Sequence, residues 1–119
     1  MNIELGRRGE DLAAAFLRKQ LHRILARNYR TPHGEIDLIT HDDASGTLCF
    51  VEVKTRRSDA HTPGEHAVNA GKRKRLRAAA KTYLVANNIH HLPTRFDIVA
   101  IVITATDATP FIRHHPDCF

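Results

Sequence analysis

The chain has 119 residues, of which 42% are hydrophobic, so its length allows one compact domain with a single core and leaves no room for a second. Its 18 Lys and Arg exceed its 13 Asp and Glu and give a formal charge of +5, a balance compatible with a polyanionic partner. Two isolated cysteines, Cys49 and Cys118, exclude a disulfide framework and a CxxC metal pair and favour a reduced, cytoplasmic setting. The early apolar run is short and contains Arg18, so we expect neither a signal peptide nor a membrane span.

The first twenty or so residues are expected to form an amphipathic helix. At the angular step of an α-helix, one arc collects the apolar side chains Leu5, Leu12, Ala13, Ala14, Phe16, Leu17 and Leu21. Glu10 is the charged residue that falls inside this arc. Either its side chain reaches water and interacts favourably with the positive end of the helix dipole, or it points toward a site within the fold.

Three short strands are expected after this helix, at Ile24–Arg30, Glu35–Thr40 and Thr47–Thr55. Turn residues separate them, first His33 with Gly34 and then the segment HDDASG, so the second and third strands should form a hairpin. The following segment, Arg56–Gly71, shows no sustained period and is expected to be a mobile loop.

A second helix is expected over KRKRLRAAAKTYLVAN, Lys72–Asn87. Its apolar residues at helical spacing are Leu76, Ala79, Ala80, Tyr83 and Leu84. Arg95–Ile103 is the most continuously apolar stretch and is expected to be the central strand, covered on both faces, while Pro110–His115 should add a short edge strand. The order α, β, β, β, α, β, β predicts a single α/β domain with a mixed central sheet flanked by helices.

Charged side chains alternate along two of these strands, on the side that a small domain normally buries. They are Glu35 and Asp37 in HGEIDLIT, and Glu52 and Lys54 in CFVEVKTR. The HDDASG loop allows a hairpin register that places Asp37 opposite Glu52, and Glu35 opposite Lys54, on one face. Directly opposed side chains have Cβ atoms about 5 Å apart, and like charges there repel, so the Asp37–Glu52 pair needs a cation.

Two interpretations of this charge remain. The first is a cross-strand salt-bridge cluster on a solvated sheet face, in which Lys54 neutralises part of the negative charge. The second is a metal site, since hard carboxylate oxygens suit Mg²⁺, and Glu10 would add a third carboxylate from a separate element. Asp37 and Glu52 would hold Mg²⁺ or Mn²⁺. Lys54 would then position a water or stabilise a phosphate, and Glu10 would act through a metal-bound water.

Basic side chains flank these strands and are expected to contact the phosphate backbone of a nucleic acid. The candidates are Arg56, Arg57, Lys72, Lys74 and Arg75. For the KRKR stretch, a solvated helix face is the alternative. The histidine pairs that begin at His90 and His114 lack cysteine or HExxH partners, which favours surface histidines over a zinc site.

Nearly the whole chain resembles a known bacterial family. GEIDLI followed by FVEVKTR, with GRRGED upstream and KRKRLRAAAKTYL and RFDIVAI downstream, is similar to predicted endonucleases that are distantly related to archaeal Holliday junction resolvases. That family belongs to the PD-(D/E)XK nuclease superfamily. The resemblance implies a restriction-endonuclease-like, three-layer core with the order αβββαβ(β). Two positions depart from the pattern: Ile36 stands in place of the superfamily's proline, and Ala79 in place of the glutamine that some relatives have.

Carried over by position, the resemblance implies that Asp37 and Glu52 are metal ligands and that the backbone carbonyl of Val53 is a further ligand. It gives Lys54 the role of the catalytic lysine and Glu10 that of the first-helix carboxylate. Lys72 would contact a phosphate or support the metal ligands.

Three functions follow as hypotheses. The first is a metal-dependent endonuclease that hydrolyses phosphodiester bonds in DNA, with branched or otherwise structured DNA as a candidate substrate. The second is a binding module on a nuclease fold that holds nucleic acid without cutting it, and the third is an RNA-binding or assembly factor. A two-fold homodimer would give a junction-cutting enzyme its two symmetric active sites.

Overall fold

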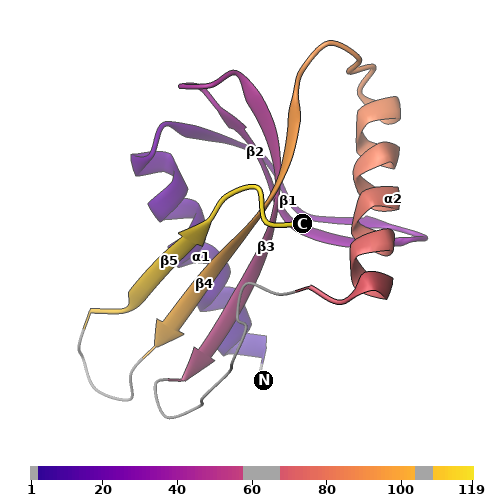
Figure 1. Cartoon of the computed structure of the whole chain (residues 1–119). Helices are drawn as coiled ribbons and strands as arrows, with labels where there is room; N and C mark the ends of the chain where they lie inside the picture. The colour runs from indigo at the N-terminus through magenta and orange to yellow at the C-terminus, as the bar shows by residue number, and fades with distance from the viewer. Residues whose placement is uncertain (1–2, 58–67, 104–108) are drawn as a thin grey trace.

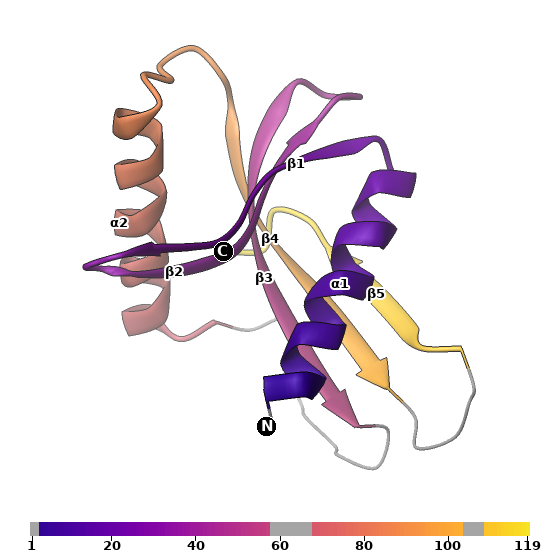
Figure 2. The ribbon, with the colours of Figure 1, turned by 180° about the vertical axis from the view of Figure 1, so that it is seen from behind.

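The computed structural model describes residues 3–57, 68–103 and 109–119, which form a five-stranded mixed sheet with a helix on each face (Figures 1 and 2). In chain order the elements are α1 (Ile3–Lys19), β1 (His22–Thr31), β2 (Gly34–Asp42), β3 (Thr47–Arg57), α2 (Ala70–Ala86), β4 (Thr94–Ile103) and β5 (Phe111–His115). The predicted order and the α/β fold class are confirmed. None of the described helices is both long and apolar enough to cross a membrane.

The sheet has the strand order β1-β2-β3-β4-β5. β1, β2 and β3 are antiparallel neighbours, β4 runs parallel to β3, and β5 returns antiparallel along β4. The prediction that Arg95–Ile103 is the central strand was wrong, because β3 takes the middle place. β4 still lies inside the sheet and has five consecutive buried residues. Its apolar run therefore indicates that both faces of the strand are covered, but it does not indicate which strand is central.

The two helices cover opposite faces, as Figure 1 and the reverse view in Figure 2 show. On one face α1 buries Ala13, Ala14 and Leu17 against Leu38 and Val51. The prediction that Leu21 belongs to the apolar side of this helix was wrong. This residue follows the helix in a left-handed conformation (φ 67°) and is 64% exposed, because the helix ends at Lys19 before a further turn can bring Leu21 inward.

On the other face α2 buries Leu76, Ala79, Ala80 and Tyr83, as the helical spacing predicted. The Tyr83 ring packs edge-on against Tyr29 of β1, with ring centroids 5.2 Å apart, and against Phe50 of β3. Two asparagines follow the end of α2: the Asn87 N–H donates to the Tyr83 carbonyl, and Asn88 takes a positive φ of 55°.

The predicted loop Arg56–Gly71 is shorter than expected at both ends. β3 continues through Arg57, because it pairs in parallel with β4 as far as Ile103. α2 begins at Ala70 because the Asn69 side chain caps it by accepting from the Lys72 N–H. The prediction that the intervening segment is mobile falls on residues 58–67, which lie outside the described residues.

A buried polar network closes the end of the sheet near the C-terminus. Asp97 is 0% exposed and accepts from Arg95 Nε at 2.8 Å and from the Asp117 N–H at 3.0 Å, while His114 Nε2 lies 2.8 Å from it. The bonds from His114, Arg95 and Asp117 outweigh the effect of burial and lower the pKa of Asp97 to about 2. The prediction of a surface histidine was therefore wrong at His114, whose ring ties β5 to β4.

α1 approaches the sheet closely at Gly9. A Cβ atom built on Gly9 would lie 1.8 Å from Thr55 Oγ1 and 2.9 Å from Thr55 Cβ, so only a glycine fits here without a shift of the helix. Gly9 is buried and directly precedes Glu10. This contact therefore sets how near Glu10 comes to the second half of β3.

Substitution Gly9→Ala is expected to lower the free energy of unfolding by about 1–3 kcal/mol, because the added methyl group must push α1 away from Thr55. Urea unfolding followed by circular dichroism measures this. The matched control is Gly71→Ala in α2, where the nearest atom to a new Cβ is 3.5 Å away, at an ordinary contact distance. Because alanine has a higher helix propensity than glycine, Gly71→Ala should leave the free energy of unfolding unchanged or raise it slightly. Equal stability of the Gly9→Ala and wild-type proteins would contradict the close contact.

Candidate active site

The hairpin register predicted from the loop length is confirmed. Leu38 pairs with Val51 and Ile39 with Phe50, the register that points Asp37 and Glu52 to the same face. The regular ladder ends at the Leu38–Val51 pair. The predicted place of Glu35 opposite Lys54 was wrong, because the ladder does not reach Glu35. Its Cα partner is Arg30 of β1, and its carboxylate lies 3.8 Å from Arg30 Nε. Asp37 therefore stands at the point where β2 leaves β3.

At this point the side chain of Asp37, in place of the β2 backbone, makes a hydrogen bond to β3. Its Oδ2 atom accepts a hydrogen bond of 2.8 Å from the Val53 N–H of β3. The bond anchors the carboxylate to the strand that carries Glu52. This bond uses one of the several acceptor positions of a carboxylate, so Asp37 can also serve as a metal ligand.

Glu52 is buried, with 9% of its surface exposed. Its Oε1 atom accepts a hydrogen bond of 2.8 Å from Lys72 Nζ in the first turn of α2. This burial contradicts the interpretation of a solvated surface cluster, because a surface ion pair would leave Glu52 hydrated. Lys72 is thus a cation at Glu52 that the sequence pattern, which predicted Lys54 as the counter-charge, did not identify.

Burial and three neighbouring carboxylates act on Asp37. Burial has the largest effect and raises its pKa, and the negative charge of Glu52 adds to it. Glu10 of α1 and Glu35 of β2 contribute in the same direction, against the lowering effect of the Val53 N–H, and the pKa of Asp37 rises to about 7. Glu10 therefore acts electrostatically on Asp37, and its role at the site stays a prediction. We call Glu10, Glu35, Asp37 and Glu52 the carboxylate cluster.

The donor set suits a hard divalent cation that needs few protein ligands. Within residues 3–57, 68–103 and 109–119, no three acidic, histidine or cysteine side chains lie close enough together to hold a metal by themselves. Mg²⁺ usually takes one or two carboxylates and completes its shell with waters and substrate phosphate, which Asp37 and Glu52 can satisfy. Glu35 and Glu10 are then neighbours that strengthen the negative field.

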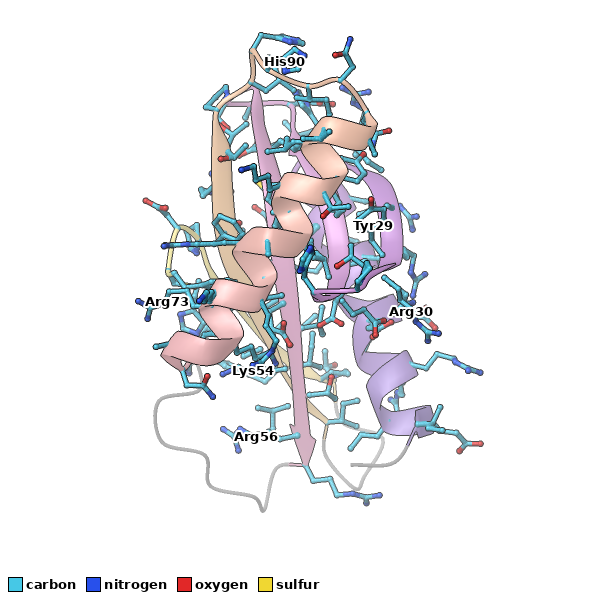
Figure 3. All side chains as sticks on the ribbon, turned by 90° about the vertical axis from the view of Figure 1, so that its right-hand side faces the viewer. Tyr29, Arg30, Lys54, Arg56, Arg73 and His90 are labelled. Carbon is cyan, nitrogen blue, oxygen red and sulfur yellow. The ribbon has the colours of Figure 1, made fainter. Side chains whose placement is uncertain are left out.

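The predicted basic residues lie on β3 and α2, and they do not all share one face: Arg57 lines a small cavity with Glu4, Leu5 and Arg8 of α1. Lys54 follows Glu52 on the same face of β3, and Figure 3 shows it at the level of the first turns of α2, with Arg56 further along the strand. Arg56 and Arg57 lie on β3 rather than in a loop, and Arg57 is exposed. Lys74 and Arg75 are exposed on α2, whereas Lys72 turns in to Glu52.

Comparison with known proteins identifies a family. The sequence matches the group described as "Uncharacterised protein family UPF0102" over residues 9–101, a span that runs from Gly9 through both site strands and α2 into β4. The chain belongs to the UPF0102 family.

Several bacterial relatives carry the same family name. A UPF0102 protein of Syntrophotalea carbinolica is 41% identical over 98% of this chain and 92% of its own length. One of Solibacter usitatus is 47% identical over 91% of this chain and 82% of its own, and one of Geobacter sulfurreducens is 42% identical over 99% and 90%. The similarity extends over the whole domain, including the elements that hold the carboxylate cluster.

Replacement of Asp37 by asparagine should stabilise this UPF0102 protein in metal-free buffer at pH 8. The folded-state pKa of about 7 lies above the ordinary value of 3.8, so the folded state keeps a proton that the unfolded chain releases. Wild-type stability should therefore fall as pH rises from about 4 to about 7. The asparagine side chain removes the charge and retains an oxygen for the Val53 N–H, so the gain at pH 8 should be about 2 kcal/mol and should shrink at pH 5.

Urea unfolding in EDTA at both pH values measures this difference. The control is Asp43→Asn, because Arg23 and His41 hold the pKa of Asp43 below its ordinary value, so its loss should not stabilise the fold. An Asp37→Asn variant that is less stable than wild type at pH 8 would show that repulsion in the carboxylate cluster is already compensated.

Proposed function

We propose that this protein is a metal-dependent endonuclease that hydrolyses phosphodiester bonds in DNA, with branched or otherwise structured DNA as its candidate substrate. One observation carries the proposal. Asp37 and the buried Glu52 share one face where β2 leaves β3, with Lys54 and Lys72 beside them. Two carboxylates and a lysine in adjacent strands match the metal-binding and lysine positions of the PD-(D/E)XK superfamily, which the sequence resembles.

A divalent cation such as Mg²⁺ or Mn²⁺ at Asp37 and Glu52 would polarise the scissile phosphate and lower the pKa of a bound water. The residues of the chain supply the rest. The Val53 N–H holds Asp37 in place, and Lys72 holds Oε1 of Glu52. Lys54 would stabilise negative charge on the phosphate, and Glu10 would accept a hydrogen bond from the attacking water. A ligand role for the Val53 carbonyl stays a prediction from the resemblance.

Cleavage assays test this function. Linear, nicked and four-way DNA are incubated with Mg²⁺ or Mn²⁺, and products are resolved on denaturing gels. Wild-type protein should cut at least one substrate, and Glu52→Gln and Lys54→Ala should cut it about 100-fold more slowly or less. The control Glu4→Gln removes an exposed carboxylate from the first turn of α1 and should cut like wild type. Cleavage that persists in EDTA, or cleavage by the Glu52→Gln variant at the wild-type rate, would contradict the proposal.

A second candidate is a module that binds nucleic acid on the same fold without cutting it. The Lys72–Glu52 ion pair favours it, because a lysine already compensates the buried Glu52 carboxylate without metal. Such a module would show salt-sensitive DNA binding that survives Asp37→Asn, and no metal-dependent product. Competition between matched DNA and RNA duplexes distinguishes DNA from RNA as the partner, and sedimentation tests the homodimer that a junction-cutting enzyme would use.

A further inference from the structure

A second basic surface lies on the α1 side of the carboxylate cluster, away from the basic residues that the sequence singled out. A polar cavity of about 530 Å³ opens between α1 and β1. Its charged lining includes Arg7, Glu10 and Asp11 of α1 and Arg27 and Arg30 of β1. Glu10 lines this cavity and also acts electrostatically on Asp37, so the cavity lies beside the candidate active site.

An unusual backbone conformation in β1 builds this surface. In a regular strand, Arg27 and Tyr29 would share one face, and Asn28 and Arg30 the other. In the structure Arg27, Asn28 and Arg30 all line the cavity, whereas Tyr29 packs against Tyr83 of α2. Asn28 has a φ of 52°, a left-handed conformation that asparagine tolerates better than most residues, and this breaks the alternation. The strand thereby directs two arginines to one cavity.

The two arginines of β1 are held differently. Arg27 Nη2 donates to Asp11 Oδ1 at 2.6 Å, which fixes its guanidinium against α1. Arg30 is 82% exposed, and its ion pair with Glu35 is long, at 3.8 Å. An exposed pair of this length contributes little stability, so the guanidinium can exchange Glu35 for a stronger anionic partner. Figure 3 shows Arg30 on the hairpin side of the molecule, above α1.

We propose that this cavity binds a backbone phosphate of DNA, on the strand that lies next to the cut strand. Arg30 and Arg7 would donate hydrogen bonds to this phosphate, and Arg27 would form part of the fixed wall of the cavity. The inference rests on the proposed function and names the second grip on its substrate. Lys74 and Arg75 of α2 would hold the DNA on one side of the carboxylate cluster, and the α1–β1 cavity on the other. Phosphate suits the arginines because a guanidinium can donate two parallel hydrogen bonds to it.

Binding without cleavage tests the inference. Fluorescence anisotropy with labelled duplex and four-way DNA is measured in EDTA over a series of salt concentrations. Arg30→Ala and Arg7→Ala should each weaken binding about five- to tenfold and should reduce the slope of log affinity against log salt by about 1. Arg30→Lys should recover part of the affinity, since it keeps the charge but loses the paired donors.

The matched control is Arg23→Ala. Arg23 lies on the same strand, is 63% exposed and pairs with Asp43, but it does not line the cavity. It should change affinity less than twofold. Affinities of Arg30→Ala and Arg7→Ala equal to that of Arg23→Ala would overturn the inference, and so would an equal loss in all three variants, which would indicate unspecific charge. Circular dichroism spectra confirm that each variant is folded.

The two proposals fail in different ways. If wild type cuts DNA but Arg30→Ala binds normally, the cavity proposal is overturned and the nuclease stands. If the arginine variants bind more weakly as expected but wild type never cuts, the nuclease proposal is overturned and the cavity remains a nucleic-acid contact. A wild-type protein that binds no DNA overturns both.

Discussion

The hydrogen bond from the Val53 N–H to the carboxylate of Asp37 is the interaction on which the candidate site depends. In a regular antiparallel pair, a backbone carbonyl of β2 would accept from that part of β3. Here an ionisable side chain accepts instead, at the point where the ladder has ended at Leu38 and Val51. The bond ties Asp37 to the strand of Glu52 and lets the two strands separate. α1 approaches β3 closely beside this point, because Gly9 allows contact with Thr55.

This arrangement lowers the stability of the fold, because it places negative charges close together and partly out of water. Burial and repulsion within the carboxylate cluster both oppose the ionised form of Asp37, while Lys72 offsets the charge of Glu52. A hydrophobic pair at the same strand positions would pack without this cost. Strongly shifted acids of this kind gather at functional sites, where a ligand supplies the missing counter-charge. In this UPF0102 protein we propose a divalent cation as that ligand, because it suits hard oxygen donors beside basic side chains.

Much of the fold follows from residue patterns that act locally. Period-two alternation and the HDDASG loop predicted the register of β2 and β3, and so placed Asp37 and Glu52 on one face. Helical spacing predicted the buried face of α2, and the charge of Glu10 inside an apolar arc identified a residue near Asp37. These signals work because the buried face of a regular element must be apolar unless something else requires a charge there.

Features that join distant elements could not be predicted in this way. The Lys72–Glu52 pair depends on how α2 sits across β3, which no local period encodes. The place of β4 beside β5, and the bond of His114 to Asp97, depend on the return of the last strand. The surface formed by Arg27 and Arg30 depends on the positive φ of Asn28, and an asparagine in a strand-like run does not by itself indicate that conformation.

The central claim is that Asp37 and Glu52 together bind a divalent cation. Diffraction from crystals soaked in Mn²⁺, recorded at a wavelength where manganese scatters anomalously, tests it most directly. We expect an anomalous peak about 2 Å from one oxygen of Asp37 and one oxygen of Glu52, which disappears in crystals of Asp37→Asn. Manganese bound only elsewhere, or an intact Lys72–Glu52 pair without a peak at saturating Mn²⁺, would contradict the claim.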